Sequence, residues 1–264
     1  MLSYLKRAHL TRHLLAQKIF RLMDEKQTNL CLSADVVSQK QLLALADLLG
    51  PEICVLKTHI DILEDYTPDL NEKLRLLAHK HRFFLFEDRK FADIGQTVSL
   101  QYEKGIYHIS SWADIVNAHP LPGPGIIEGL KQIGQPLMRG LLLIAEMSSA
   151  GSLATGDYTK KAVEMAEAHS DFVFGFITQQ KLTDNPAMIH FTPGVKMHAG
   201  KDSLGQRYRT VEDAICKYKT DVIIVGRDIT HAADPLSSAK MIRQTAWECY
   251  RQREQDKEAS QDQR

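Results

Sequence analysis

The stretch Phe83-Phe84-Leu85-Phe86-Glu87-Asp88-Arg89-Lys90 places four apolar residues directly before two acids and two bases. Four consecutive apolar residues are typical of a parallel strand that is buried on both faces. Because side chains alternate along a strand, Asp88 and Lys90 should lie on one face and Arg89 on the other. Burying such charges is costly unless they are paired or used. The stretch therefore predicts a buried strand that ends in a functional carboxylate and ammonium pair.

Similar short apolar runs recur along the whole chain. The eight runs are Leu30–Ser33, Ile53–Leu56, Phe83–Phe86, Asp114–Val116, Leu141–Ile144, Phe172–Ile177, Ile189–Phe191 and Val222–Val225. Amphipathic helical segments lie between most of them, for example 39–49, 69–80, 158–168 and 233–250. Eight alternations of strand and helix predict an α/β protein with the (β/α)8 barrel fold. An open doubly wound sheet is the alternative, but no G-x-G-x-x-G follows the first run.

Length and composition limit the class of protein. The 264 residues are 44% hydrophobic, and 33 basic residues balance 33 acidic ones, so no basic field favours nucleic acid or an anionic membrane. No apolar run is long enough to cross a membrane. Cys31 and Cys54 lie in apolar runs without metal-ligand spacing, which indicates free thiols in a reducing compartment and a cytoplasmic protein.

The two ends of the chain differ from the rest. Residues 1–23 hold no acid, which is typical of a transit peptide, or of a plain amphipathic helix with Leu2, Leu5, Leu14, Leu15, Ile19 and Phe20 on its apolar side. The last twelve residues, 253–264, are polar and charged. We expect a single barrel domain over 1–252, including this N-terminal helix, and a frayed, disordered tail over 253–264.

Polar residues follow the first three predicted strands in a shared pattern. Strand one leads to Ser33 and Asp35, strand two to Lys57 and His59, and strand three to Asp88 and Lys90. In a barrel these ends meet at one mouth, so alternating charges from Asp35, Lys57, Asp88 and Lys90 should converge there. A structural salt bridge remains the alternative for any single pair. Asp93 and Thr97 would share a helix face, or Asp93 would simply cap that helix.

The second half of the chain carries residues suited to binding an anion. The run Val222–Val225 is followed by Gly226, which lets a phosphate approach the backbone, and by Arg227, which can grip it. The loop from His198 to Tyr208 contains Gly200, Gly205 and Gln206, which favours a mobile lid over an ordinary solvated loop. After strand five, Met147-Ser148-Ser149 could present hydroxyls to a flat polar ring.

These motifs together resemble the orotidine 5′-phosphate decarboxylase family over nearly the whole chain. Asp88, Lys90 and Asp93 form the D-x-K-x-x-D pattern of that family, and the surrounding F-E-D-R-K-F-A-D-I-G is similar to its longer, eukaryote-type branch. No phosphoribosyltransferase segment precedes the barrel, so the resemblance implies the stand-alone decarboxylase. It implies conversion of orotidine 5′-monophosphate to uridine 5′-monophosphate and CO2, the last step of de novo pyrimidine biosynthesis. This lyase would be a homodimer without metal or organic cofactor.

The resemblance also implies roles for particular residues. Lys90 would protonate C6 of the pyrimidine beside Asp88, with Lys57 and Asp93 completing the catalytic charge network. Asp93 and Thr97 would reach the neighbouring subunit's site. Asp35 and Lys57 would bind ribose hydroxyls, as would Asp93 and Thr97. Met147, Ser148 and Pro193 would surround the pyrimidine, and Gln206, Tyr208, Gly226 and Arg227 would hold the phosphate. Ser33 is a further implied binding residue, and His59 is a supporting neighbour.

Two other functions stay open from the sequence. A metal-dependent sugar-phosphate decarboxylase or aldolase-like enzyme can use the same barrel and motif, but it needs an extra carboxylate for the metal. Glu87 is a poor candidate for that carboxylate, because alternation points it away from Asp88. A non-catalytic nucleotide-binding protein is the second alternative, and it would not require both Lys90 and Asp88.

Overall fold

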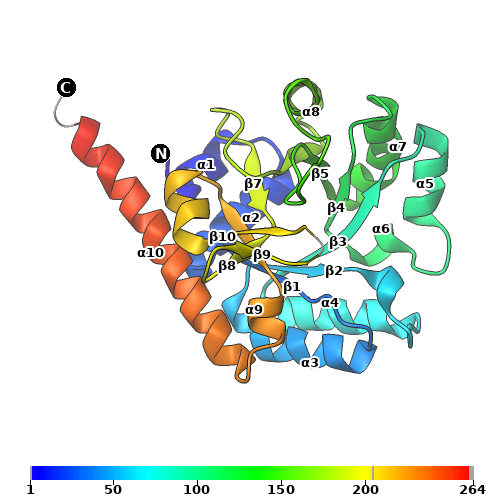
Figure 1. The fold of residues 1–264 in the computed structure, drawn as a ribbon. Helices are drawn as coiled ribbons and strands as arrows, with labels where there is room; N and C mark the ends of the chain where they lie inside the picture. The colour runs from blue at the N-terminus through cyan, green and yellow to red at the C-terminus, as the bar shows by residue number, and fades with distance from the viewer. Residues whose placement is uncertain (1, 204, 262–264) are drawn as a thin grey trace.

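The computed structural model describes residues 2–203 and 205–261. Eight strands form a closed barrel in the order β1-β11-β7-β6-β5-β4-β3-β2 (Figure 1). They are β1 Leu30–Ser33, β2 Val55–Thr58, β3 Phe84–Phe91, β4 Ile115–Ala118, β5 Gly140–Ile144, β6 Val173–Ile177, β7 Ile189–Thr192 and β11 Val222–Val225. Each overlaps one of the predicted runs. The (β/α)8 prediction is therefore confirmed, and the open doubly wound alternative is wrong.

The barrel closes because β1 pairs in parallel with strands from both ends of the chain. Cys31 lies opposite Val55 of β2, and Leu30 lies opposite Ile223 of β11. All residues of these strands are buried, as are those of β4 to β7, which matches their continuous apolar character. In β3 the burial is incomplete near Asp88 and Lys90. This strand therefore brings its charges to the mouth of an otherwise apolar barrel.

Helices cover the outside of the barrel (Figure 1). They are α1 Tyr4–Leu10, α2 Leu14–Lys26, α3 Gln39–Leu49, α4 Asp69–His81, α5 Gly95–Glu103, α6 Ile109–Trp112, α7 Gly125–Gly134, α8 Asp157–Ala168, α9 Arg227–Thr230 and α10 Pro235–Gln261. Short 3-10 turns, η1 Gly50–Glu52, η2 Ile60–Ile62 and η3 Gln135–Leu137, and a π-helical turn, η4 Asp213–Lys217, complete the connections. Within the described residues, no helix combines the length and the apolar character needed to cross a membrane.

The N-terminal segment forms two helices instead of the expected single amphipathic helix. Helix α1 ends at Leu10, and the His13 side chain caps the start of α2. The break lets α1 turn, so that Tyr4 and Arg7 are buried and Arg7 pairs with the buried carboxylate of Asp221. The apolar face was therefore predicted correctly for Leu15, Ile19 and Phe20 and wrongly for the exposed Leu2, Leu5 and Leu14.

Helix α10 continues beyond the boundary expected for a frayed tail. It runs to Gln261, and residues 262–264 of the predicted tail lie outside the described residues. Arg253 is buried, and its guanidinium donates to the carbonyl oxygens of Ile215 and Thr220 at 3.1 and 2.9 Å. These bonds hold helix α10 in place at the residue where the polar tail was predicted to begin.

The long connection after β7 contains a small sheet. Its strands are β8 Val195–Lys196, β9 Gly200–Lys201 and β10 Arg207–Thr210, in the order β8-β10-β9. Tyr208 of β10 lies opposite Gly200 of β9, and Arg209 lies opposite Val195 of β8. Gly200, Lys201, Arg207 and Tyr208 of the segment predicted as a lid are thus strand residues, while Leu204 of that prediction lies outside the described residues.

Candidate active site

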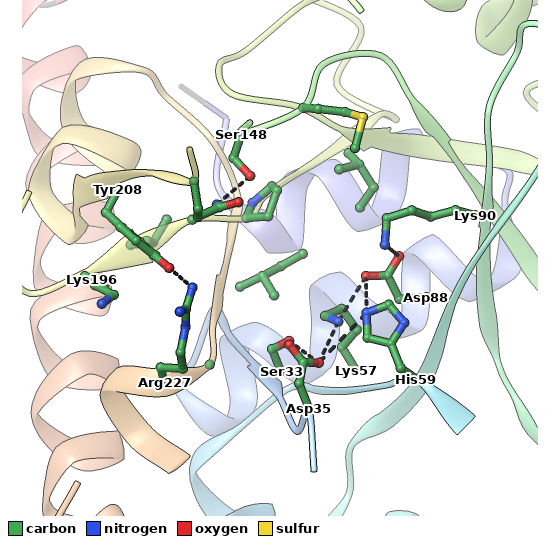
Figure 2. Close-up of a pocket in the computed structure, with 18 of the residues that line it drawn as sticks. Ser33, Asp35, Lys57, His59, Asp88, Lys90, Ser148, Lys196, Tyr208 and Arg227 are labelled. Atoms are coloured by element: carbon green, nitrogen blue, oxygen red, sulfur yellow. Dashed lines mark hydrogen bonds and ion pairs between the residues drawn. The ribbon is translucent and has the colours of Figure 1, made fainter. Parts of the chain in front are cut away.

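A pocket of about 270 Å³ lies at the carboxyl ends of the barrel strands. Figure 2 shows charged side chains at one end of it and Tyr208, Lys196 and Arg227 at the other. The lining residues are Ser33, Asp35, Lys57, His59, Asp88, Lys90, Ile144, Met147, Ser148, Ile177, Pro193, Gly194, Val195, Lys196, Gln206, Tyr208, Ile224, Gly226 and Arg227. Thirteen of the fifteen different site residues predicted from the sequence are in this set, and Asp93 and Thr97 are not.

Four charged side chains alternate in sign along one wall of the pocket. Lys57 Nζ lies 3.2 Å from Asp35 Oδ1 and 3.0 Å from Asp88 Oδ2. Lys90 Nζ lies 2.7 Å from Asp88 Oδ1. The strand ends therefore bring together the predicted row Asp35, Lys57, Asp88, Lys90, as Figure 2 shows. Such a row can place an ammonium and a carboxylate against adjacent atoms of a ligand.

The pairing keeps the cluster ionised despite its burial. Burial alone would lower the pKa of Lys57, but the adjacent carboxylates of Asp88 and Asp35 raise it above its usual value. Burial alone would raise the pKa of Asp88, but Lys57, His59 and Lys90 hold it well below the usual range. The charged forms are therefore stabilised by one another.

Lys90 reaches Asp88 through a β-bulge, which the simple alternation of a strand did not anticipate. The register of β3 against β4 shifts between Glu87 and Phe91, and Lys90 has φ +51°. A left-handed backbone is unfavourable for a residue with a side chain and persists only where its surroundings hold it. The predicted contact between Asp88 and Lys90 is present, but the bulge and not simple strand alternation sets the direction of the Lys90 side chain.

Asn117 holds this bulge, and the sequence reasoning missed it. Its Nδ2 donates to Asp88 Oδ1 at 2.7 Å, and its Oδ1 accepts the backbone N–H of Lys90 at 2.7 Å. The residue is buried at the end of β4. The run predicted for this strand stopped at Val116, whereas β4 continues through Asn117 to Ala118. Extending the strand-end rule to strand four would have found it.

Glu87 points away from the pocket, as predicted. It is fully buried, and its carboxyl accepts from the Thr58 hydroxyl at 2.7 Å and from the Ile60 backbone N–H at 3.0 Å. Burial raises the pKa of Glu87 to about 8. Both partners flank His59, whose Nε2 lies 3.2 Å from Asp88 Oδ2. Glu87 thus fixes the backbone that carries His59 to the cluster.

The opposite end of the pocket is rich in hydrogen-bond donors. Arg227 donates to the Tyr208 hydroxyl, and Gln206 Nε2 donates to the Ser148 hydroxyl at 2.7 Å. Lys196 was not predicted; its Nζ lies 4.1 Å from the centre of the Tyr208 ring. It lies two residues after Gly194, and no motif in the sequence marks this lysine as a binding residue. Together these groups can bind an anion.

Small and apolar residues shape the pocket between its two ends. Gly194 has φ +74°, and a Cβ there would lie 2.6 Å from the carbonyl oxygen of Arg207, so glycine allows β10 to approach. A side chain at Gly226 would press against Ser33, with Cβ atoms 3.3 Å apart. Met147 and Pro193 line the pocket together with isoleucines, which gives it apolar surface as well as charged groups.

Asp93 and Thr97 lie outside the pocket of their own chain. Asp93 Oδ1 accepts the N–H of Ile94 at 2.7 Å, and its Oδ2 accepts from Gln101 Nε2 at 3.4 Å. Ile94 is the N-cap residue of α5, and no side chain in the described part of the protein caps the first turn, so the interpretation of Asp93 as the helix cap is wrong. Within residues 2–203 and 205–261, no group of three or more His, Cys, Asp or Glu side chains is arranged to hold a metal ion.

Comparison with known proteins identifies the family. The profile of the "Orotidine 5'-phosphate decarboxylase / HUMPS family" matches residues 28–242. The chain is 50% identical over 253 residues to the orotidine 5′-phosphate decarboxylase of Schizosaccharomyces pombe, covering 95% of this chain and 96% of that one. It is 55% identical over 250 residues to the uridine 5′-monophosphate synthase of Bos taurus, covering 94% of this chain but only 52% of the bovine protein.

A solved structure has the same fold. The orotidine 5′-monophosphate decarboxylase of Methanocaldococcus jannaschii, crystallised with the inhibitor BMP, superposes with a TM-score of 0.66 at 19% identity, over 83% of this chain and 98% of that one. At this identity the likeness concerns the barrel alone. The family match over residues 28–242 extends through the three strands that carry the charge cluster and through the strand before Arg227. The chain belongs to the orotidine 5′-phosphate decarboxylase / HUMPS family.

Proposed function

We propose that this protein converts orotidine 5′-monophosphate to uridine 5′-monophosphate and CO2 and so completes de novo pyrimidine biosynthesis. The observation that carries the proposal is the charge distribution of the pocket, with the alternating row at one end and Tyr208 and Arg227 at the other. The proposed substrate has a carboxylate on its base and a phosphate on its ribose. The two anionic ends of this molecule suit the two ends of the pocket.

Lys90 is the proposed general acid. When the bond between C6 and the carboxylate breaks, the electron pair stays on C6, and CO2 leaves. The Lys90 ammonium, fixed by its 2.7 Å contact with Asp88, stabilises this charge and then transfers a proton to C6. Water afterwards restores the proton of Lys90. Asp88 lies beside the departing carboxylate, where its negative charge favours loss of the substrate charge.

The remaining pocket residues position the nucleotide. Asp35 and Lys57 hold ribose hydroxyls, with Ser33 and His59 supporting them. Ser148 hydrogen-bonds the pyrimidine edge between Met147 and Pro193. Gln206, Tyr208, Gly226 and Arg227 hold the phosphate. Because the phosphate is far from the reacting bond, its binding energy organises the charged row instead of taking part in the chemistry.

A homodimer is part of the proposal, with Asp93 and Thr97 completing the partner's site. In support, both residues lie outside the pocket of their own chain. Large apolar side chains on connections at the same end of the barrel are strongly exposed, namely Ile94 at 66%, Leu121 at 78% and Leu153 at 92%. Exposed apolar groups of this size are typical of a surface that a partner covers.

The dimer proposal is tested by mixing two inactive variants, Lys90→Ala and Asp93→Ala. A mixed dimer would contain one site with both an intact Lys90 and an intact Asp93 from the partner, so activity should return on mixing. If Asp93 acts within its own chain, every site in the mixture lacks one group and activity stays absent.

Absorbance of orotidine 5′-monophosphate in the presence of pure protein tests the function itself. We expect conversion to uridine 5′-monophosphate at the same rate with and without EDTA. Loss of the activity in EDTA would favour the metal-dependent sugar-phosphate enzyme, although the inward bonds of Glu87 argue against a metal there. Absence of conversion by a folded protein that still binds the nucleotide would favour the non-catalytic binding protein.

A further inference from the structure

One carboxylate, that of Asp202, contacts the groups proposed to bind the phosphate. Its Oδ2 accepts from the Arg227 guanidinium at 2.7 Å and from the Tyr208 hydroxyl at 3.2 Å. Its Oδ1 accepts the backbone N–H of Gln206 at 2.9 Å. A phosphate oxygen bound by Arg227 and Tyr208 would use the same donors. The Asp202 carboxylate therefore lies where the phosphate of a ligand would bind.

We propose that Asp202 is a specificity-determining residue that competes with the ligand's phosphate for Arg227 and Tyr208. This inference rests on the proposed function, since it takes the anion to be a nucleotide phosphate. Two anions on the same donors repel each other, so one must leave. A phosphate dianion attracts Arg227 more strongly than a single carboxylate does. Asp202 thus admits a dianionic phosphate and disfavours weaker anions at the same place.

The surroundings of Asp202 allow its side chain to leave while the backbone stays. The residue follows β9, and its backbone is held separately, because its N–H donates to the Gln206 carbonyl at 3.0 Å. The side chain of Asp202 is 22% exposed and that of Arg227 is 53% exposed, so both can turn toward solvent. Rotation of the Asp202 side chain alone therefore exchanges one anion for the other.

Asp228 provides a matched control at the same end of the pocket. Its Oδ1 lies 3.6 Å from Lys196 Nζ, and its Oδ2 accepts the Met197 N–H at 3.0 Å. It carries the same charge as Asp202, but its contacts are with Lys196 and Met197 and not with Arg227 or Tyr208, the two donors that Asp202 occupies. Asp228→Asn removes a nearby charge without removing a competitor for Arg227 and Tyr208, which separates direct competition for these two donors from a general change in potential.

Isothermal titration of the full chain with uridine 5′-monophosphate, inorganic phosphate and uridine tests the inference. Asp202→Asn retains an oxygen for the Gln206 N–H and should bind both phosphate-containing probes up to about fivefold tighter, the gain expected from loss of one exposed ion pair. Uridine affinity should not change. Asp228→Asn should change phosphate affinity less than half as much. Asp202→Ser serves as a second variant with the same expectation, and thermal melting verifies that each variant folds.

The outcomes separate this inference from the proposed function. If Asp202→Asn or Asp202→Ser binds phosphate no better than the wild type, or if Asp228→Asn gives an equal gain, competition by Asp202 is refuted. If the wild type binds uridine 5′-monophosphate no better than uridine, the phosphate site itself is absent and the proposed function fails with it.

Discussion

Replacing Asn117 with alanine should disable the charge cluster without removing any of its charges. The change deletes the 2.7 Å bond from Nδ2 to Asp88 and the 2.7 Å bond that holds the Lys90 N–H. A hydrogen bond to a charged group contributes about 1.5–3 kcal/mol, and a neutral one about 1 kcal/mol. The free energy of unfolding should therefore fall by roughly 2.5–4 kcal/mol.

The loss should also reach catalysis, because Asn117 holds Lys90 in its left-handed backbone conformation. If losing these bonds raises the free energy of the transition state by about 3 kcal/mol, kcat should drop by roughly two orders of magnitude. Urea unfolding and the orotidine 5′-monophosphate absorbance assay measure the two effects on one preparation.

Asn71→Ala is the matched control for this experiment. Asn71 donates to the Tyr107 carbonyl at 3.1 Å from helix α4 and is not among the residues that line the pocket. The Asn71→Ala variant should lose about 1 kcal/mol in free energy of unfolding and keep its decarboxylase activity. If Asn117→Ala behaves like Asn71→Ala, or loses stability yet keeps its turnover, Asn117 does not position Lys90.

Two further predictions concern the buried acid and the anion-binding end. The folded-state pKa of Glu87 is about 8, above the usual value for glutamate, so the wild type should lose stability as pH rises from about 4 to 8, because the folded state holds the proton more tightly. Urea unfolding should show that the free energy of unfolding falls less between pH 5 and pH 8 for Glu87→Gln than for the wild type. If both proteins lose the same amount, other groups cause the pH dependence. Arg227→Ala should reduce kcat/KM on the full nucleotide by roughly 10²-fold or more, since it removes a charge-assisted contact, and should leave turnover of the nucleoside without phosphate almost unchanged. Equal losses on both substrates would refute a phosphate role for Arg227.

The barrel was predictable because its signal is repetitive. Continuous apolar runs and amphipathic segments recur along the whole chain. Strands buried on both faces, such as β1 and β11, are typical of a parallel sheet covered by helices. The charged row was predictable for the same reason: Asp35, Lys57 and Asp88 each follow a run, and the carboxyl ends of parallel strands meet at one mouth.

Other features depend on contacts between distant segments that local patterns do not encode. The bulge that turns Lys90 depends on Asn117 of the next strand. Lys196 and Asp202 enter the site only because the connection after β7 folds into a small sheet. Leu2, Leu5 and Leu14 were assigned to a buried face because the helix break at residues 11–13 was not recognised.

The most direct test of the account compares wild type with Lys90→Ala, by turnover of orotidine 5′-monophosphate and by uridine 5′-monophosphate affinity on the same preparations. We expect the wild type to convert the substrate and the variant to lose at least about 10³-fold in kcat while its nucleotide affinity stays within about threefold, because Lys90 acts on the reacting carbon. Near-normal turnover by a folded Lys90→Ala variant would contradict the central claim that the charged row performs the chemistry.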